Sequence, residues 1–191
     1  YTNMFSTELN LIKNEKIKEA GVILVKKLPS YFYDIPASST GKYHPKYTCG
    51  KMGLYRHVKA AVKIASSLLE LEMYSRIFTK EEKDLIILAL ILHDGFKKGI
   101  TEEKYTRFDH PIIMKDFIIS MKNELPIPEQ TVEKLASLVE THMGQWINDF
   151  NGNEVLKKPV DKAQKFVHMC DYLASRKFLN VEFDANNEII D

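Results

Sequence analysis

The sequence predicts an all-α protein, and three observations support this fold class. Residues 79–82 read Thr-Lys-Glu-Glu, a capping box in which the threonine hydroxyl and a glutamate carboxylate satisfy backbone N–H groups at a helix start. Residues 85–92 are all apolar, which predicts a central helix packed on every side. Apolar residues recur at helical spacing elsewhere. A run such as 85–92 also suits a buried strand, but the capping box and the length favour a helix.

Helical periodicity predicts six helices in chain order. The expected ranges are 10–27, 57–74, 79–93, 110–122, 128–142 and 161–177. Asp109 or His110 caps the fourth helix, because Pro111 then falls in the first turn, where its missing N–H costs nothing. Asp161, shortly after Pro159, opens the sixth helix.

Two segments are expected outside these helices. Residues 29–53 contain three prolines, three glycines and five tyrosines or phenylalanines, which predicts a long aromatic loop before the second helix. Residues 181–184 alternate like a strand, and 185–187 can turn the chain back towards Ile189. A short C-terminal β-hairpin is therefore expected.

Composition bounds the possible functions. The chain has 191 residues and a formal net charge of +1, so we expect one domain (1–191) with no global field that attracts nucleic acid or membrane. No apolar run approaches the roughly 20 residues of a membrane span, so a cytoplasmic protein with no membrane partner is expected. Cys49 and Cys170 lie far apart and form no CxxC pair, which argues against a disulfide framework or a thiolate zinc site.

Four of the six histidines fall on inward faces of different helices. His57, His110 and His142 each share a helix face with apolar residues, and His93 ends the apolar run. One such histidine is more often a core residue bonded to a backbone carbonyl. Four together leave many buried ring nitrogens to satisfy, and a metal centre satisfies them collectively.

Two aspartates supply the carboxylates that such a centre needs. Asp94 follows His93 directly, and Asp171 lies within the apolar sixth helix, where an unpaired carboxylate is costly. Imidazole and carboxylate donors without thiolate suit Mn, Fe, Co, Ni or Zn and leave positions open for water and substrate. This donor set points to hydrolysis.

The ordered residues resemble the HD-domain metal-dependent phosphohydrolases, an all-helical superfamily. The residues that carry the resemblance are His57, the doublet His93-Asp94 with Lys97 three residues later, His110, His142, and the Asp-Tyr-x-x-x-Arg segment from Asp171 to Arg176. The doublet with Lys97 is similar to the family's HDxxK stretch. His110 and His142 resemble the added histidines of its dinuclear branch. The resemblance covers about residues 41–176 and implies a compact HD-type helical bundle.

The resemblance also implies a ligand set for two metals. His57, His93 and Asp171 would bind one ion, Asp94 would bridge, and His110 with His142 would bind the second. Two such ions lower the pKa of a shared water to about 7, which provides a hydroxide for attack on phosphorus. Asp94 and Lys97 are the expected catalytic residues.

Two subgroups of the family look most similar. The small bacterial hydrolases of dinucleoside polyphosphates are similar in the spacing of the last three ligands. The HD-domain 3′-to-5′ exoribonucleases are similar in residues 36–38, His44 and residues 53–57.

Lys42, His44, Arg56, Lys97 and Arg176 are the candidate substrate-binding residues. No acidic residue occurs between Asp34 and Glu70, where the basic residues are Lys42, Lys46, Lys51, Arg56, Lys59 and Lys63. With the interleaved tyrosines, this block either attracts phosphate and stacks bases or is a solvated helix face beside a packed loop. Lys97 and Arg176 either bind phosphate or are a solvated lysine and a carboxylate partner.

We therefore expect a metal-dependent hydrolase of phosphate esters or anhydrides, above all of a nucleotide. One alternative is a 3′-to-5′ exonuclease or phosphodiesterase on single-stranded RNA or DNA. The other is a nucleotide-sensing or partner-binding module with a structural metal. The sole tryptophan, Trp146, either packs or stacks on a base, and His168 either supports a ligand or is an ordinary core or surface residue.

Overall fold

The protein is all-α throughout residues 4–179, the part of the chain that the computed structural model describes. Its α-helices are α1 (Ser6–Leu9), α2 (Glu15–Val25), α3 (Gly53–Glu70), α4 (Glu72–Ser75), α5 (Lys80–Leu92), α6 (His110–Ser120), α7 (Glu129–Glu140) and α8 (Lys162–Ala174). Three 3-10 turns add Ser30–Tyr33, Lys46–Thr48 and Lys177–Leu179. Within 4–179 the only β pairing is one isolated bridge, Asn148 to Glu154. The expected C-terminal hairpin lies outside the described residues.

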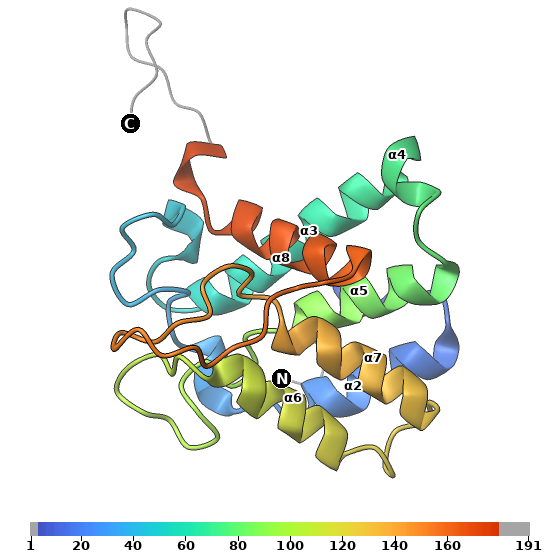
Figure 1. Cartoon of the computed structure of the whole chain (residues 1–191), viewed down its shortest axis with the longest axis horizontal. Helices are drawn as coiled ribbons and strands as arrows, with labels where there is room; N and C mark the ends of the chain where they lie inside the picture. The colour runs from blue at the N-terminus through green and yellow to red at the C-terminus, as the bar shows by residue number, and fades with distance from the viewer. Residues whose placement is uncertain (1–3, 180–191) are drawn as a thin grey trace, which may run out of the picture.

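Helix α5 is the centre of the fold, as the sequence predicts. The Thr79 hydroxyl accepts from the Glu82 N–H, and the Glu82 carboxylate accepts from the Thr79 N–H, which completes the capping box. Every residue from 84 to 92 is buried. Helices α1, α2, α3, α7 and α8 all contact α5, which therefore runs through the core with its C-terminal end enclosed (Figure 1).

The predicted helix 10–27 is wrong at its start. The chain forms the short α1, turns, and begins α2 at residue 15. The buried Asp84 carboxylate on α5 accepts from the Lys13 and Asn14 N–H groups at 2.9 Å each, and the Asn14 side chain caps α2. A polar residue of the central helix thus fixes where α2 begins.

Three other helix ends refine the predictions. Helix α3 begins one turn before the expected residue 57 and ends at Glu70, and the extended backbone of Leu71 separates it from α4. Asp109 is the N-cap of α6 with Pro111 in the first turn, as predicted, but its carboxylate makes no capping hydrogen bond, because it pairs with the Arg107 guanidinium at 2.8 Å. Asp161 opens α8 as predicted, in a capping box with Gln164.

The first part of the loop before α3 belongs to the core. Tyr31, Phe32 and Tyr33 are buried in its first 3-10 turn, and the Tyr31 hydroxyl donates to the Gly99 carbonyl. The Arg56 guanidinium donates to the backbone carbonyls of Tyr47, Cys49 and Lys51. The loop is therefore fastened to the start of α3, and only some of its aromatic side chains remain exposed.

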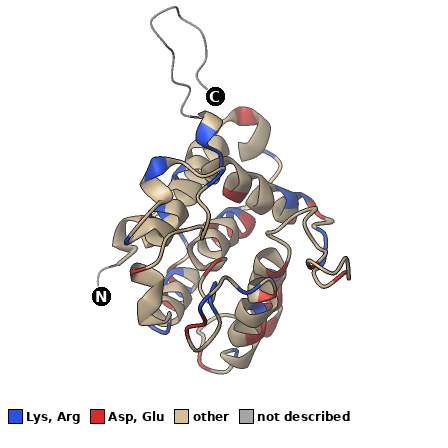
Figure 2. Cartoon of the chain, turned by 90° about the vertical axis from the view of Figure 1, so that its left-hand side faces the viewer, with Lys and Arg blue, Asp and Glu red and all other residues tan. Residues whose placement is uncertain are grey.

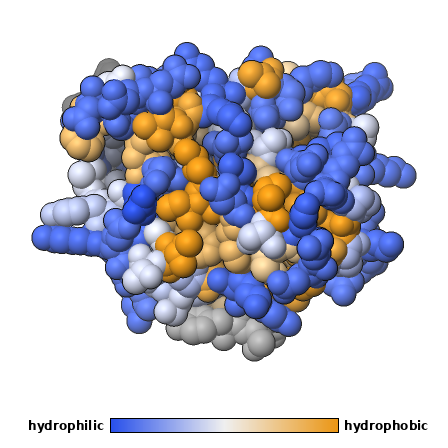
Figure 3. Space-filling view, turned by 60° about the horizontal axis from the view of Figure 1, so that its bottom comes forward, coloured by the Kyte–Doolittle hydropathy of each residue, from blue (hydrophilic) through white to orange (hydrophobic). Residues whose placement is uncertain are grey.

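Charged and apolar residues are interspersed on the faces drawn in Figures 2 and 3. Acidic and basic residues are distributed over the same helices in Figure 2. On the face turned forward in Figure 3, apolar side chains gather in separate groups between hydrophilic ones. Within residues 4–179, none of the helices has the length and hydropathy that a bilayer span requires.

Candidate metal centre

Six side chains from five segments meet beside the C-terminal end of α5. They are His57 from α3, His93 and Asp94 at the end of α5, His110 at the start of α6, His142 just beyond α7, and Asp171 from α8. The side chains of the first five are at most 3% exposed, and that of Asp171 is 17% exposed. The structure thus brings together all six of the ligands expected from the sequence. Their position follows from the packing of the surrounding helices on α5.

The Asp94 carboxylate lies between two groups of imidazoles. Its Oδ2 atom is 3.5 Å from His93 Nε2 and 3.9 Å from His57 Nε2. Its Oδ1 atom is 3.0 Å from His110 Nε2 and 3.6 Å from His142 Nε2. Each oxygen therefore faces a different pair of ring nitrogens.

The Asp171 carboxylate contacts the same two imidazoles as Asp94 Oδ2, those of His57 and His93. Its Oδ1 atom is 2.9 Å from His57 Nε2 and 3.3 Å from His93 Nε2. Three overlapping triads have ligand atoms within 4.8 Å of one another: His57, His93 and Asp94; His93, His142 and Asp171; and Asp94, His110 and His142. The buried cluster is therefore arranged so that it could hold a metal ion.

Backbone hydrogen bonds fix the orientation of three of the rings. The Nδ1 atoms of His93, His110 and His142 lie 2.7 Å from the carbonyl oxygens of Leu90, Arg107 and Val139, three residues earlier in each case. A carbonyl only accepts, so each Nδ1 carries the proton. When Nε2 carries no proton, as metal binding requires, its lone pair points to the centre of the cluster.

Two of the inward-facing donor atoms have no hydrogen-bond partner within residues 4–179. His93 Nε2 and Asp94 Oδ1 are buried and have no hydrogen-bond partner among the described residues. His110 Nε2 and His142 Nε2 lie 3.2 Å apart. Lone pairs that face one another in a buried site are costly, and a metal ion placed among them removes that cost. The residues therefore fit a metal, with nitrogen and oxygen donors of the kind that divalent transition metals prefer.

Neighbouring charges shift the pKa values of three residues of the cluster. Burial alone would raise the pKa of Asp94, but Lys97 and His93 hold it well below its usual range, and His93 and His57 do the same for Asp171. Burial alone would lower the pKa of His93, but Asp94 and Asp171 raise it to about 9. Both carboxylates are therefore ionised at neutral pH, as ligands must be.

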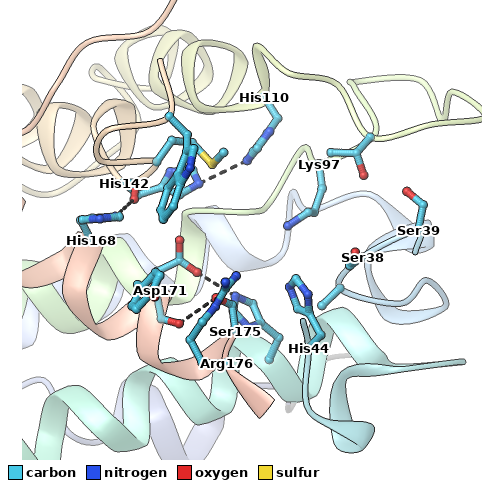
Figure 4. A pocket seen from close by; sticks show the side chains of 16 residues that line it. Ser38, Ser39, His44, Lys97, His110, His142, His168, Asp171, Ser175 and Arg176 are labelled. Carbon is cyan, nitrogen blue, oxygen red and sulfur yellow. Dashed lines mark hydrogen bonds and ion pairs between the residues drawn. The ribbon is translucent and has the colours of Figure 1, made fainter. Parts of the chain in front are cut away.

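A cavity of about 340 Å³ opens above the cluster. Four of the six expected ligands line it: His57, His110, His142 and Asp171, of which Figure 4 labels the last three. His93 and Asp94 are buried and are not part of the lining. The pocket therefore gives a small molecule direct access to the metal-binding groups.

Three of the five predicted substrate-binding residues line this pocket. They are Lys97, whose Nζ atom lies 2.5 Å from Asp94 Oδ2, Arg176 on the last turn after α8, and His44. Burial, together with nearby His57 and Lys97, lowers the pKa of His44 to about 4, so that this ring is neutral at pH 7.

Lys42 and Arg56 do not line the pocket. Lys42 is exposed, with its Nζ atom 5.0 Å from the centre of the Tyr43 ring, and the Arg56 guanidinium is occupied by backbone carbonyls. Other charges of the basic block are also paired elsewhere: Lys59 with Glu8 and Lys51 with Asp34. The block therefore contributes much less charge to the pocket than its density in the sequence suggests.

Several pocket residues were not identified as site residues from the sequence. The polar ones are Ser38, Ser39, Thr106 and Ser175. Ser175 could have been found, because it lies four residues after Asp171 and so shares a helical face with it. Thr106 comes from the loop between α5 and α6, where no pattern marks it.

His168 supports a ligand through the backbone. Its Nδ1 atom lies 2.7 Å from the His142 carbonyl oxygen and donates to it. The ring also contacts the edge of Trp146. His168 thus ties the segment after α7 to α8 beside the cluster.

No protein-family model, no curated protein and no solved structure matches this chain. The function must therefore be inferred from the helical fold and the geometry of the buried His/Asp cluster.

Proposed function

We propose that the protein is a metal-dependent hydrolase of phosphate esters or anhydrides, of the HD-domain type. The observation that carries the proposal is the Asp94 carboxylate, which offers one oxygen to each of two imidazole groups beneath an open pocket. A purely structural metal site is normally closed by protein ligands, whereas catalytic sites keep an open position. The open pocket therefore supports a catalytic role.

The proposed site holds two ions, both divalent transition metals. His57, His93 and Asp171 would hold one, His110 and His142 the other, and Asp94 would bridge. When bound, such ions polarise phosphoryl oxygens and lower the pKa of water to about 7.

Lys97 and Arg176 supply positive charge for a phosphate group. The Lys97 ammonium neutralises Asp94 here, and ions bound to the cluster would release it towards the pocket. The Arg176 guanidinium lies 4.8 Å from the centre of the Tyr172 ring, and its Nε–H donates to the Ser175 hydroxyl at 3.0 Å. Its terminal N–H groups can donate to phosphate oxygens. Neutral His44 can donate or accept a hydrogen bond without adding charge.

The dimensions of the pocket favour a small substrate. About 340 Å³ falls within the range of small-molecule sites and holds a phosphate with one modest organic group. A nuclease on long strands would need a groove that continues past the cluster, so the phosphodiesterase activity on nucleic acid ranks second.

The first test combines metal content with hydrolysis. Elemental analysis of the purified protein should give about two transition metal ions per chain, and the loaded protein should release phosphate from phosphate esters or anhydrides. The variant Asp94→Asn should lose at least about 100-fold in kcat/KM while keeping its circular dichroism spectrum. A metal-loaded protein that cleaves neither small phosphates nor an end-labelled oligonucleotide would establish the binding-module alternative instead.

Two adjacent lysines provide a matched comparison within that test. Lys97→Ala should lower kcat/KM by about 10- to 100-fold, because a charged phosphate contact is lost. Lys98→Ala should leave kcat/KM unchanged, since the Lys98 Nζ atom pairs with Glu102 at 3.0 Å and the residue does not line the pocket. Equal losses in both variants would show that Lys97 acts only through stability.

A further inference from the structure

A row of flat side chains forms one wall of the pocket. The Trp146 indole lies nearly parallel to the Tyr172 ring, with centroids 5.8 Å apart and an angle of 14°. The Arg176 guanidinium lies 4.8 Å from the centre of the Tyr172 ring and 5.5 Å from that of Tyr43. Three of these four residues, Trp146, Tyr172 and Arg176, line the pocket.

Trp146 is held in a fixed position relative to the metal cluster. The turn that carries it follows His142, and Gly144 within that turn has a φ of +65°. A Cβ atom on Gly144 would lie 2.2 Å from the His168 ring, so the backbone is folded tightly onto His168. The His168 ring in turn donates a hydrogen bond to the His142 carbonyl, and its centroid lies 5.8 Å from that of the Trp146 ring.

The indole nevertheless keeps a free surface. Trp146 is 44% exposed, although the Tyr172 ring lies nearly parallel to it at a centroid distance of 5.8 Å and the His168 ring meets it at a steep angle. Trp146 also lines the pocket, so its exposed indole surface is open to a ligand there. A rigid indole left open in a pocket, one side chain away from a guanidinium, is the arrangement that stacks on a nucleobase.

The two sides of the pocket carry different side chains, aromatic rings on one and small hydroxyl residues on the other. The labelled His168 lies on the side that carries the aromatic wall, whereas Ser38 and Ser39 lie across the pocket from it (Figure 4). A ligand that has its phosphate at the cluster finds the Trp146 indole on the first side of the pocket.

We propose that Trp146 is the stacking surface for the base of the substrate, so that the substrate is a nucleoside phosphate. This inference rests on the phosphohydrolase activity proposed above and names its substrate class. Trp146 contacts the base, Arg176 contacts the phosphate, and Tyr172, packed between them in the row, sets their spacing.

The experiment uses the fact that Trp146 is the sole tryptophan of the chain. The metal-loaded protein is mixed in a stopped-flow fluorimeter with AMP, GMP, CMP or UMP, and separately with ribose 5-phosphate, which has the same sugar phosphate but no base. At least one nucleotide should quench the tryptophan emission within the mixing phase, and ribose 5-phosphate should not. The KM for that nucleotide should be about 10-fold below the KM for ribose 5-phosphate.

Variants separate stacking from general stability. Trp146→Ala should raise the nucleotide KM about 10-fold, with little change in kcat or in the KM for ribose 5-phosphate, and Trp146→Phe should restore most of the difference. Phe150→Ala is the matched control, because Phe150 is four residues further on, 97% exposed and outside the pocket lining, and its KM values should not change.

The outcomes distinguish the two proposals. Hydrolysis with equal KM values for nucleotides and ribose 5-phosphate, and without quenching, would overturn the stacking role and leave the phosphohydrolase standing. Quenching by nucleotides alone, without hydrolysis of any phosphate, would retain Trp146 as a base-binding surface and overturn the phosphohydrolase.

Discussion

His93 links the stability of the metal-free protein to pH. Asp94 and Asp171 overcome the effect of burial and raise the pKa of this imidazole from 6.5 to about 9. The folded chain therefore holds a proton that the unfolded chain releases above pH 6.5. The stabilisation is complete below pH 6.5 and is lost between about 6.5 and 9.

Urea unfolding of the chelator-treated protein from pH 6.5 to 9 should show a free energy of unfolding that falls throughout this range. Burial lowers the pKa of His110, so the effect of His110 on the free energy of unfolding falls below pH 6.5 and does not overlap with that of His93. His93→Gln should flatten the curve, since glutamine holds no titrating proton. A wild-type curve that is already flat would mean that His93 is neutral in the folded state.

Residue types and helix faces predict the ligands of this site because both are local properties of the sequence. The partner of a long charged side chain is not local. Lys59 meets Glu8 from 51 residues away, and Arg56 bonds carbonyls of a loop whose path depends on the core. The sequence therefore predicts the buried His/Asp cluster well and the charged lining of the pocket poorly.

At the scale of one element, the capping box of α5 has a measurable effect. Thr79→Ala removes the hydroxyl that accepts from the Glu82 N–H and should destabilise the protein by about 1 kcal/mol. For a chain of this size, that corresponds to a fall in Tm of about 2–4 °C by calorimetry. Thr79→Ser keeps the hydroxyl and should retain most of the Tm; equal losses in both variants would show that the methyl group, not the cap, matters.

Helix ends are predictable where their signals are local. The starts of α5 and α8 carry capping boxes within four residues and were predicted to within one position. The start of α2 was missed because Asp84, which holds the preceding N–H groups, lies 70 residues further along the chain. Pro111 predicts Asp109 as the cap of α6, whereas the pairing of the Asp109 carboxylate with Arg107 depends on the conformation of the loop before α6.

For the whole molecule, a bound metal should stabilise the entire fold, because its ligands come from α3, α5, α6, α8 and the segment after α7. Adding Mn²⁺ or Zn²⁺ at about 100 times Kd to the chelator-treated protein should contribute about 2.7 kcal/mol. The expected rise in Tm is about 5–10 °C in a thermal melt.

Two aspartate variants make this measurement specific. Asp171→Asn should reduce the metal-dependent rise, because a carboxylate ligand is weakened. Asp149→Asn should leave it unchanged, since Asp149 lies on the turn at residues 149–153, outside the pocket lining, and its carboxylate bonds only within that turn. A Tm that does not respond to any divalent transition metal would contradict the metal centre.

The wide spacing of the ligands along the chain has a consequence for biosynthesis. His57 and Asp171, which meet at 2.9 Å, are separated by 114 residues. At a synthesis rate of about 5–20 residues per second, roughly 6–23 s pass between the translation of one and of the other. A nascent chain cannot assemble the full ligand set until α8 has left the ribosome. Ion insertion, if the cluster takes metal as proposed, is therefore a late step in the maturation of this protein, and a chain that stalls before α8 is released without a complete site.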